Sequence, residues 1–134
     1  MTLVDSNVLI DLLTTNREWI AWSAEWLERR AAAGPVYFNE IVYSELAVKS
    51  TNEADLDKAL HDLGLRLNQI PKSALFLAGK VFGRYKSGGG TRGSNLPDFF
   101  IGAHARVAKL PILTRDTRRY RSYFPDVELI APNL

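Results

Sequence analysis

Four of the fifteen acidic residues stand where a carboxylate could do chemistry. Asp5 interrupts the run LVDSNVLI directly after a short β-type segment, and Asp98 opens the apolar run PDFFIGAHA. Glu45 lies among apolar neighbours in a helical pattern, and Asp116 follows the segment PILT by two residues. If these carboxylates converge, their repulsion calls for a compensating cation, and hard oxygen ligands favour Mg²⁺ or Mn²⁺.

Each carboxylate also has a structural alternative. An aspartate after a strand is often a turn or cap residue. Asp98 could merely complement its helix dipole, an effect of about 0.3–1 kcal/mol, and Glu45 could point to solvent. Other chemistries find less support. The chain has no cysteine and no phosphate-loop pattern, and its two histidines, His61 and His104, lie far apart on separate predicted helices, which favours structural roles.

The elements that must position these residues alternate along the chain. Short β-type segments fall at 2–4, 35–38, 65–70, 111–114 and 127–131, and helical patterns fall at 6–13, 18–34, 40–50, 54–64, 74–86 and 97–109. Strands separated by helices predict a layered α/β fold with a mostly parallel sheet, in one domain for 134 residues. In such sheets ligands bind beyond the carboxyl ends of the strands, where Asp5 and Asp116 are expected.

Local signals refine these helices. Ser6 or Asn7 is expected to cap the first helix and Asn39 the third, with Ser73 capping the helix that follows Pro71. Asp11 is expected to face solvent, because the apolar residues of its helix occupy the inner stripe. Three tryptophans at helical spacing, at positions 19, 22 and 26, favour packing over a stacking platform for nucleic acid.

The net charge of +2 says little, but the basic residues are grouped. Such groups suit a polyanion, although a solvated surface is the more common explanation. The two groups are Arg84, Lys86 and Arg92, around the glycine-rich segment 86–95, and Arg115, Arg118, Arg119 and Arg121. No apolar run is long enough for a membrane helix, and the absence of cysteine fits a reducing cytosol, so a cytoplasmic location is expected.

In this order and at this spacing, Asp5-Ser6-Asn7 with its apolar helix, SEL, PDFFIGAHA and ILTRD resemble the motifs of a PIN domain. More narrowly, the chain resembles the VapC-type toxins of bacterial toxin–antitoxin pairs over residues 1–134. The resemblance implies a three-layer α/β/α fold in which four acidic residues bind Mg²⁺ or Mn²⁺ and direct hydrolysis of an RNA phosphodiester. By motif these are Asp5, Glu45, Asp98 and Asp116, with Ser6, Asn7 and Thr114 orienting them. Glu40 competes with Glu45, and the SEL pattern favours Glu45.

The resemblance therefore implies a metal-dependent endoribonuclease that acts as a toxin, with the two groups of basic residues as the predicted RNA contacts. It also implies a small antitoxin partner and a homodimer or toxin–antitoxin hetero-oligomer. The alternative is a non-catalytic PIN-like module that binds RNA or protein. A phosphoryl transferase on a similar fold is disfavoured, because an aspartyl-phosphate enzyme usually needs a second aspartate at position 7, where this chain has Asn7.

Overall fold

The computed structural model describes residues 1–89 and 96–132. Within these residues five short strands form one sheet: β1 (Thr2–Val4), β2 (Val36–Phe38), β3 (Leu65–Leu67), β4 (Ile112–Leu113) and β5 (Leu129–Ile130). The helices of the same residues are α1 (Ser6–Leu13), α2 (Ile20–Ala33), α3 (Glu40–Ala47), α4 (Glu53–Asp62), α5 (Lys72–Ser87), α6 (Leu96–Ala108) and α7 (Arg118–Tyr123). The predicted α/β class is therefore confirmed.

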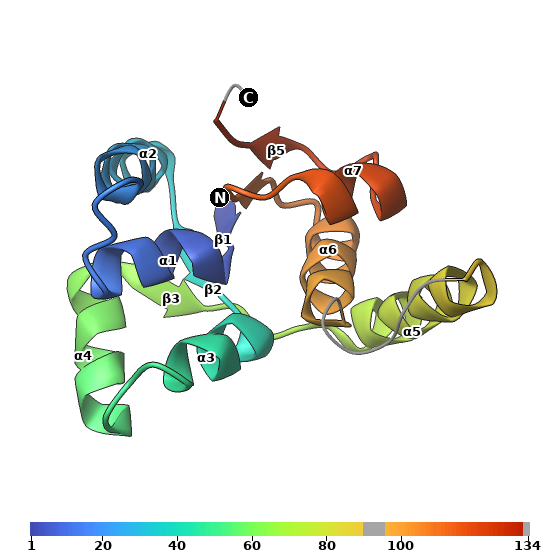
Figure 1. Ribbon diagram of the computed structural model, residues 1–134, viewed down its shortest axis with the longest axis horizontal. Coiled ribbons are helices and arrows are strands. Elements are labelled where there is room, and N and C mark those ends of the chain that lie inside the picture. The colour runs from blue at the N-terminus through green and yellow to red at the C-terminus, as the bar shows by residue number, and fades with distance from the viewer. Residues whose placement is uncertain (90–95, 133–134) are drawn as a thin grey trace.

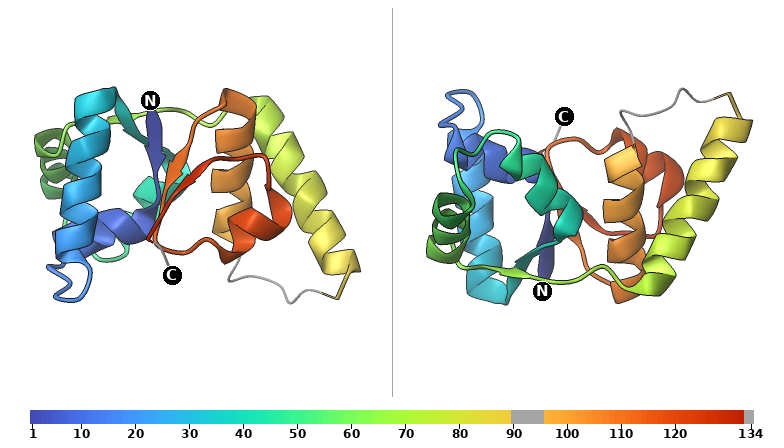
Figure 2. Two further views of the ribbon diagram at one scale, coloured as in Figure 1. Left: turned by 90° about the horizontal axis from the view of Figure 1, so that it is seen from above. Right: turned by 90° about the horizontal axis from the view of Figure 1, so that it is seen from below.

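The sheet has the order β3-β2-β1-β4-β5, and every pair of neighbours is parallel. The chain leaves β1 toward β2 and β3, then crosses back to place β4 on the other side of β1. Helices α1, α2 and α4 lie on one side of the sheet, and α5, α6 and α7 on the other (Figures 1 and 2). The result is the expected three-layer α/β/α arrangement.

The central strands are apolar on both faces because helices cover both sides of the sheet. Leu3 and Val4 of β1 and Ile112 and Leu113 of β4 are fully buried. Val4 pairs in register with Leu113, so the residues that follow the two strands leave the sheet at the same level. The order in which the chain adds strands reverses between β1 and β4, and sheets of this kind bind ligands beyond the carboxyl ends of the strands at such a point.

The caps of the helices differ in part from expectation. Asp5, in extended conformation, caps α1 in place of Ser6 or Asn7, because its carboxylate accepts the free N–H of Ser6. Asn39 caps α3 as predicted. Helix α5 begins at Lys72, directly after Pro71 and ahead of the start that a Ser73 cap would give it.

The sequence pattern also missed one helix. The basic segment at 115–124 contains α7, whose six residues include three exposed polar side chains, Arg118, Arg121 and Ser122, and one buried residue, Tyr120. A helix this short and this polar shows no apolar periodicity, so the pattern could not indicate it.

Trp22 and Trp26 pack against the hydrophobic core, which confirms the packing interpretation for these two side chains. Trp19 meets Trp22 edge to face, with ring centroids 6.2 Å apart. In the part of the chain that the structure describes, no helix is both long and apolar enough to span a membrane.

Candidate active site

Asp5 stands at the carboxyl end of β1, beside the point where the strand order reverses. It is 4% exposed, and its backbone N–H donates to the carbonyl of Leu113 on β4. Its Oδ1 accepts the backbone N–H of Ser6 at 2.8 Å, and its Oδ2 accepts the hydroxyl of Thr114 at 2.8 Å. The register of β1 and β4 thus joins the first carboxylate to the residue that follows the fourth strand.

Tyr120 is a third donor to Asp5, and the sequence analysis missed it. Its hydroxyl donates to Asp5 Oδ2 at 2.8 Å from α7, and the side chain is 1% exposed. Burial, reinforced by the charge of Asp5, raises the pKa of Tyr120 well above its usual value, so the phenol stays protonated and can donate. The only sequence signal was an aromatic residue inside a basic segment.

Ser6 connects Asp5 to Glu45. The serine backbone N–H binds Asp5, while its Oγ donates to Glu45 Oε1 at 2.8 Å. Burial raises the pKa of Glu45, and the nearby charge of Asp5 raises it further. Glu40 is exposed and instead accepts the backbone N–H of Ile70 at 2.9 Å, so Glu45 is the glutamate of α3 that lies at the site.

Asp98 lies in the first turn of α6, and its carboxyl is strongly perturbed. Burial, together with the charges of Asp5, Glu45 and Asp116, raises its pKa to about 7. Burial raises the pKa of Asp5 as well. Asp98 therefore lies within electrostatic reach of each of the other three predicted carboxylates.

Asp116 is the most exposed of the four. Arg118 approaches it with two guanidinium nitrogens, each 3.3 Å from a carboxylate oxygen, and also donates its backbone N–H. The hydrogen bond from the Arg118 side chain is the main cause that lowers the pKa of Asp116. The backbone N–H of Asp116 donates to Thr114 Oγ at 3.1 Å, which ties this carboxylate to the hydroxyl that binds Asp5.

Asn7 completes this hydrogen-bond network. Its amide nitrogen lies 3.2 Å from Thr114 Oγ and 3.5 Å from Asp5 Oδ2, and its Oδ1 accepts the backbone N–H of Arg115 at 3.1 Å. Ser6, Asn7 and Thr114, which the resemblance assigned to orienting roles, therefore all contact Asp5.

The prediction that Asp11 faces solvent is wrong. Asp11 is fully buried, and its carboxylate pairs with Arg115 through two contacts, at 2.6 and 2.8 Å. It also accepts the hydroxyl of Ser23 on α2 at 2.7 Å. The apolar stripe of α1 misled the interpretation because the compensating arginine comes from the far end of the chain, after β4.

The other predicted RNA contacts differ in their surroundings. Arg84, Lys86, Arg118 and Arg121 are exposed. Arg119 is partly buried, and its guanidinium lies 5.8 Å from the ring centroid of Tyr85. Its buried Nε has no hydrogen-bond partner among the described residues, and its charge lowers the pKa of both Asp98 and Asp116. Arg92 lies outside the described residues.

The donor set fits a hard divalent cation. Among residues 1–89 and 96–132, no three acidic or histidine side chains are already spaced to hold a metal ion. Yet burial raises the pKa of Asp5, Glu45 and Asp98, and the charge of a neighbouring carboxylate raises each of these pKa values further. The site therefore carries more negative charge than nearby cations neutralise, and all of this charge is on oxygen atoms. Mg²⁺ and Mn²⁺ prefer such oxygen ligands and would neutralise the excess charge.

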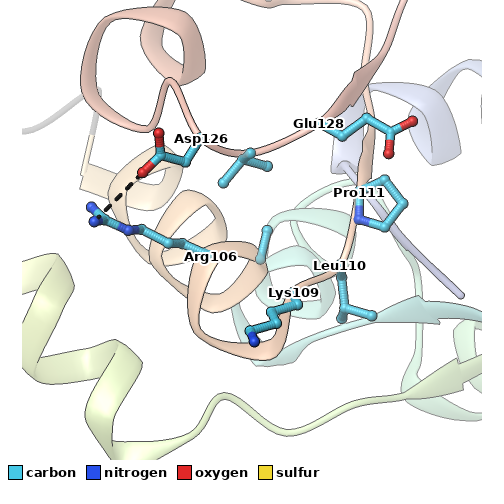
Figure 3. Close-up of a pocket in the computed structure, with 8 residues that line it drawn as sticks. Arg106, Lys109, Leu110, Pro111, Asp126 and Glu128 are labelled. Atoms are coloured by element: carbon cyan, nitrogen blue, oxygen red, sulfur yellow. Dashed lines mark ion pairs between the residues drawn. The ribbon is translucent and has the colours of Figure 1, made fainter.

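A separate pocket of about 390 Å³ lies at the opposite edge of the sheet (Figure 3). Its lining includes Arg106, Lys109, Leu110, Pro111, Asp126 and Glu128. These residues precede β4 and β5, so the pocket is at the amino ends of the parallel strands. It contains none of the four carboxylates and belongs to the edge of the sheet where such folds seldom bind ligands.

Known proteins support the interpretation of this fold. The family model for the PIN domain matches residues 2–125. VapBC2 from Rickettsia felis, solved with a DNA fragment from its promoter, has a TM-score of 0.74 at 18% identity, covering 98% of each chain.

Two further solved structures agree. VapBC-1 from nontypeable Haemophilus influenzae has a TM-score of 0.71 at 20% identity, with 97% of this chain and 96% of that chain covered. A toxin–antitoxin complex from Klebsiella pneumoniae has a TM-score of 0.69 at 24% identity, covering 99% and 98% of the two chains. No curated protein sequence matches the chain. At these identities the solved structures establish the fold, and the family model, which spans nearly the whole chain, shows that this protein belongs to the PIN-domain family.

Proposed function

We propose that the protein is a metal-dependent endoribonuclease and the toxin of a VapC-type toxin–antitoxin pair. The observation that carries the proposal is the pKa of Asp98, which burial and the charges of Asp5, Glu45 and Asp116 raise to about 7. Carboxylates that repel one another at the edge of the sheet where ligands bind are better explained by a shared bound cation than by a separate structural role for each of them.

Asp5, Glu45, Asp98 and Asp116 would hold Mg²⁺ or Mn²⁺. Such an ion activates a water molecule for attack on phosphorus and offsets the charge that develops on the phosphate oxygens. The chain's own residues prepare the site. Thr114 and Tyr120 fix Oδ2 of Asp5, and the Ser6 N–H fixes Oδ1, so the buried carboxylate has little freedom to rotate.

The basic residues of α5 and α7 would hold the RNA backbone. Arg118, Arg119 and Arg121 lie on α7, which also supplies Tyr120 to the site, and Arg84 and Lys86 lie in the last turn of α5. Arg92 remains a prediction for the segment that joins α5 to α6. Phosphate contacts give affinity that falls with salt but do not select a sequence, so the choice of RNA depends on exposed bases.

The toxin assignment rests on the sequence motifs and on the likeness of this fold to solved VapBC complexes. On this proposal a small antitoxin protein binds the chain and suppresses its activity, in a homodimer or a hetero-oligomer of the cytoplasm. Expression of the chain alone should arrest growth, and expression with its antitoxin should not.

Asp5→Asn tests the catalytic part of the proposal. The amide keeps the shape of the side chain but loses the charge, so the protein should fold while RNA cleavage with Mg²⁺ or Mn²⁺ falls by at least about 100-fold. Asp126→Asn, an exposed change at the opposite edge of the sheet, is the matched control and should cleave normally.

Two results would contradict the proposal. Cleavage that survives both EDTA and Asp5→Asn would show that the carboxylates are not the catalytic groups. RNA binding without turnover under either metal would favour the non-catalytic module.

A further inference from the structure

Arg115 differs from the other arginines near the site because its guanidinium already pairs closely with a buried carboxylate. Its Nε and Nη2 contact Asp11 at 2.6 and 2.8 Å, and Asp11 is fully buried. The guanidinium carbon lies 5.0 Å from the ring centroid of Trp19. The Arg115 side chain is 22% exposed, against 87% for Arg118.

This geometry uses the properties that separate arginine from lysine. The planar guanidinium matches a carboxylate through two parallel hydrogen bonds, and it also packs on an aromatic face. Ser23 donates to Asp11 as well, at 2.7 Å, so α2 helps to hold the acceptor in place. A cation satisfied in this way gains little from leaving its partner to bind a phosphate.

The same helix holds Arg115 in two ways. Asn7 and Asp11 lie one turn apart on α1, so they face the same direction. Asn7 accepts the backbone N–H of Arg115 at 3.1 Å, while Asp11 binds its side chain. Arg115 therefore fastens the segment after β4 to α1 through its main chain and its side chain together.

The neighbours of Arg115 are two residues of the site. Thr114 donates to Asp5 Oδ2 at 2.8 Å, and Asp116 carries the fourth carboxylate. A shift of Arg115 would move both, and with them the spacing of Asp5 and Asp116. Ligand spacing controls the affinity and geometry of a bound cation.

We propose that the buried Asp11–Arg115 pair is a positioning device that sets the spacing of the Asp5 and Asp116 carboxylates, and that Arg115 does not contact the RNA backbone. This inference rests on the proposed function and deepens it. It divides the basic residues after β4 into one positioning residue and a group of phosphate contacts.

The main test replaces the pair by apolar side chains of similar volume. Removing one partner leaves a buried charge uncompensated, whereas exchanging both often keeps the fold. In Asp11→Leu/Arg115→Met we expect a folded protein whose thermal midpoint is only moderately lowered, because the buried hydroxyl of Ser23 loses its acceptor. Mn²⁺ affinity, measured by calorimetry without RNA, should fall about 10- to 100-fold. The kcat for RNA cleavage should fall with it, while KM stays the same.

Arg121→Met, an exposed change on α7, should give the opposite pattern. Its Mn²⁺ affinity should equal that of the wild type, its KM should rise, and the slope of log affinity against log salt should decrease by about 1. The double variant should keep the wild-type salt slope. A decreased slope in the double variant, or unchanged Mn²⁺ affinity and kcat in a folded double variant, would overturn the inference.

Arg115→Lys covers the case in which the double variant fails to fold. Lysine keeps the charge but cannot make the two-point contact. We expect a folded protein with weaker Mn²⁺ binding and an unchanged salt slope, and wild-type Mn²⁺ binding would overturn the inference. A wild-type chain that binds Mn²⁺ without cleaving RNA overturns the proposed function alone. A wild-type chain that does not bind Mn²⁺ overturns both.

Discussion

Asp5 is held by donors from three separate parts of the chain. Ser6 follows it directly, Thr114 comes from the end of β4, and Tyr120 comes from α7. Hydrogen bonds to the ionised form lower a carboxyl pKa, and here they oppose the larger effect of burial, which leaves the pKa of Asp5 raised. Because Asp5 is buried away from water, these three donors take the place of water in stabilising its charged form.

Tyr120→Phe removes one of these donors and so tests whether the Tyr120 hydroxyl helps to keep Asp5 charged. The ring keeps its packing, but Asp5 Oδ2 loses a donor, so the pKa of Asp5 should rise further. We expect the acid limb of the pH–rate profile for RNA cleavage to move to higher pH, with kcat about 10-fold lower at neutral pH. The measurement is a series of cleavage rates across pH at saturating metal.

Tyr123→Phe is the matched control for this change. Tyr123 lies in the same helix, packs against Phe99 and Tyr85, and makes no hydrogen bond to an acidic group among the described residues. Its pH profile should match that of the wild type. Equal profiles for both tyrosine variants would contradict a role for the Tyr120 hydroxyl.

Residues of the site differ in how far sequence alone could predict them. Asp5 and Asp98 could be proposed because a charge inside an apolar run is visible locally. Tyr120 and the Asp11–Arg115 pair could not, since each depends on a partner at the other end of the chain. The predicted set of four carboxylates remains a prediction as a metal site, although Asp98 lies within electrostatic reach of the other three.

At the scale of elements, α6 must lie close to α7 for Asp98 and Tyr120 to serve one site. Gly102 on α6 makes this approach possible, because a Cβ there would clash with the ring carbons of Phe124, directly after α7. Phe124 is almost fully buried, so its ring cannot move aside without disturbing the core. Sequence patterns predicted α6 as a helix but gave no information on how closely it packs.

Gly102→Ala should therefore destabilise the protein by about 1–3 kcal/mol, although alanine favours helices. Gly79→Ala on α5 provides the contrast, because a Cβ added there would meet nothing within 4 Å. That variant should be more stable by roughly 1 kcal/mol. Urea unfolding of the two variants measures both effects, and equal midpoints would contradict the close packing of α6 on Phe124.

At the scale of the whole molecule, the site costs stability when no cation is bound. The pKa of Asp98 is about 7, and those of Asp5 and Glu45 are also raised. Between about pH 4, where an unfolded aspartate loses its proton, and pH 7, the folded state binds more protons than the unfolded state. The free energy of unfolding contributed by these groups is therefore greatest below this window and decreases as pH rises through it.

Asp98→Asn removes this penalty above neutral pH. At pH 8 without metal, the variant should melt about 4 °C higher than the wild type, which corresponds to about 1 kcal/mol for a chain of this size. At about pH 3, below the pKa of an unfolded aspartate, Asp98 is protonated in both states and the two should melt together. Mg²⁺ should raise the midpoint of the wild type at about pH 8 more than that of the variant. Thermal scans at both pH values test this, and a variant no more stable at the higher pH would contradict it.

The order of the strands has a consequence for how the protein is made. β1 holds the middle of the sheet, but its neighbour β4 and the donor Tyr120 come from residues 112–120. Synthesis proceeds from the amino end at about 5–20 residues per second, so Asp5 leaves the ribosome several seconds before the groups that fix it. If the chain is a ribonuclease, it stays inactive beside its own messenger RNA until that late segment emerges, which gives an antitoxin time to be present first.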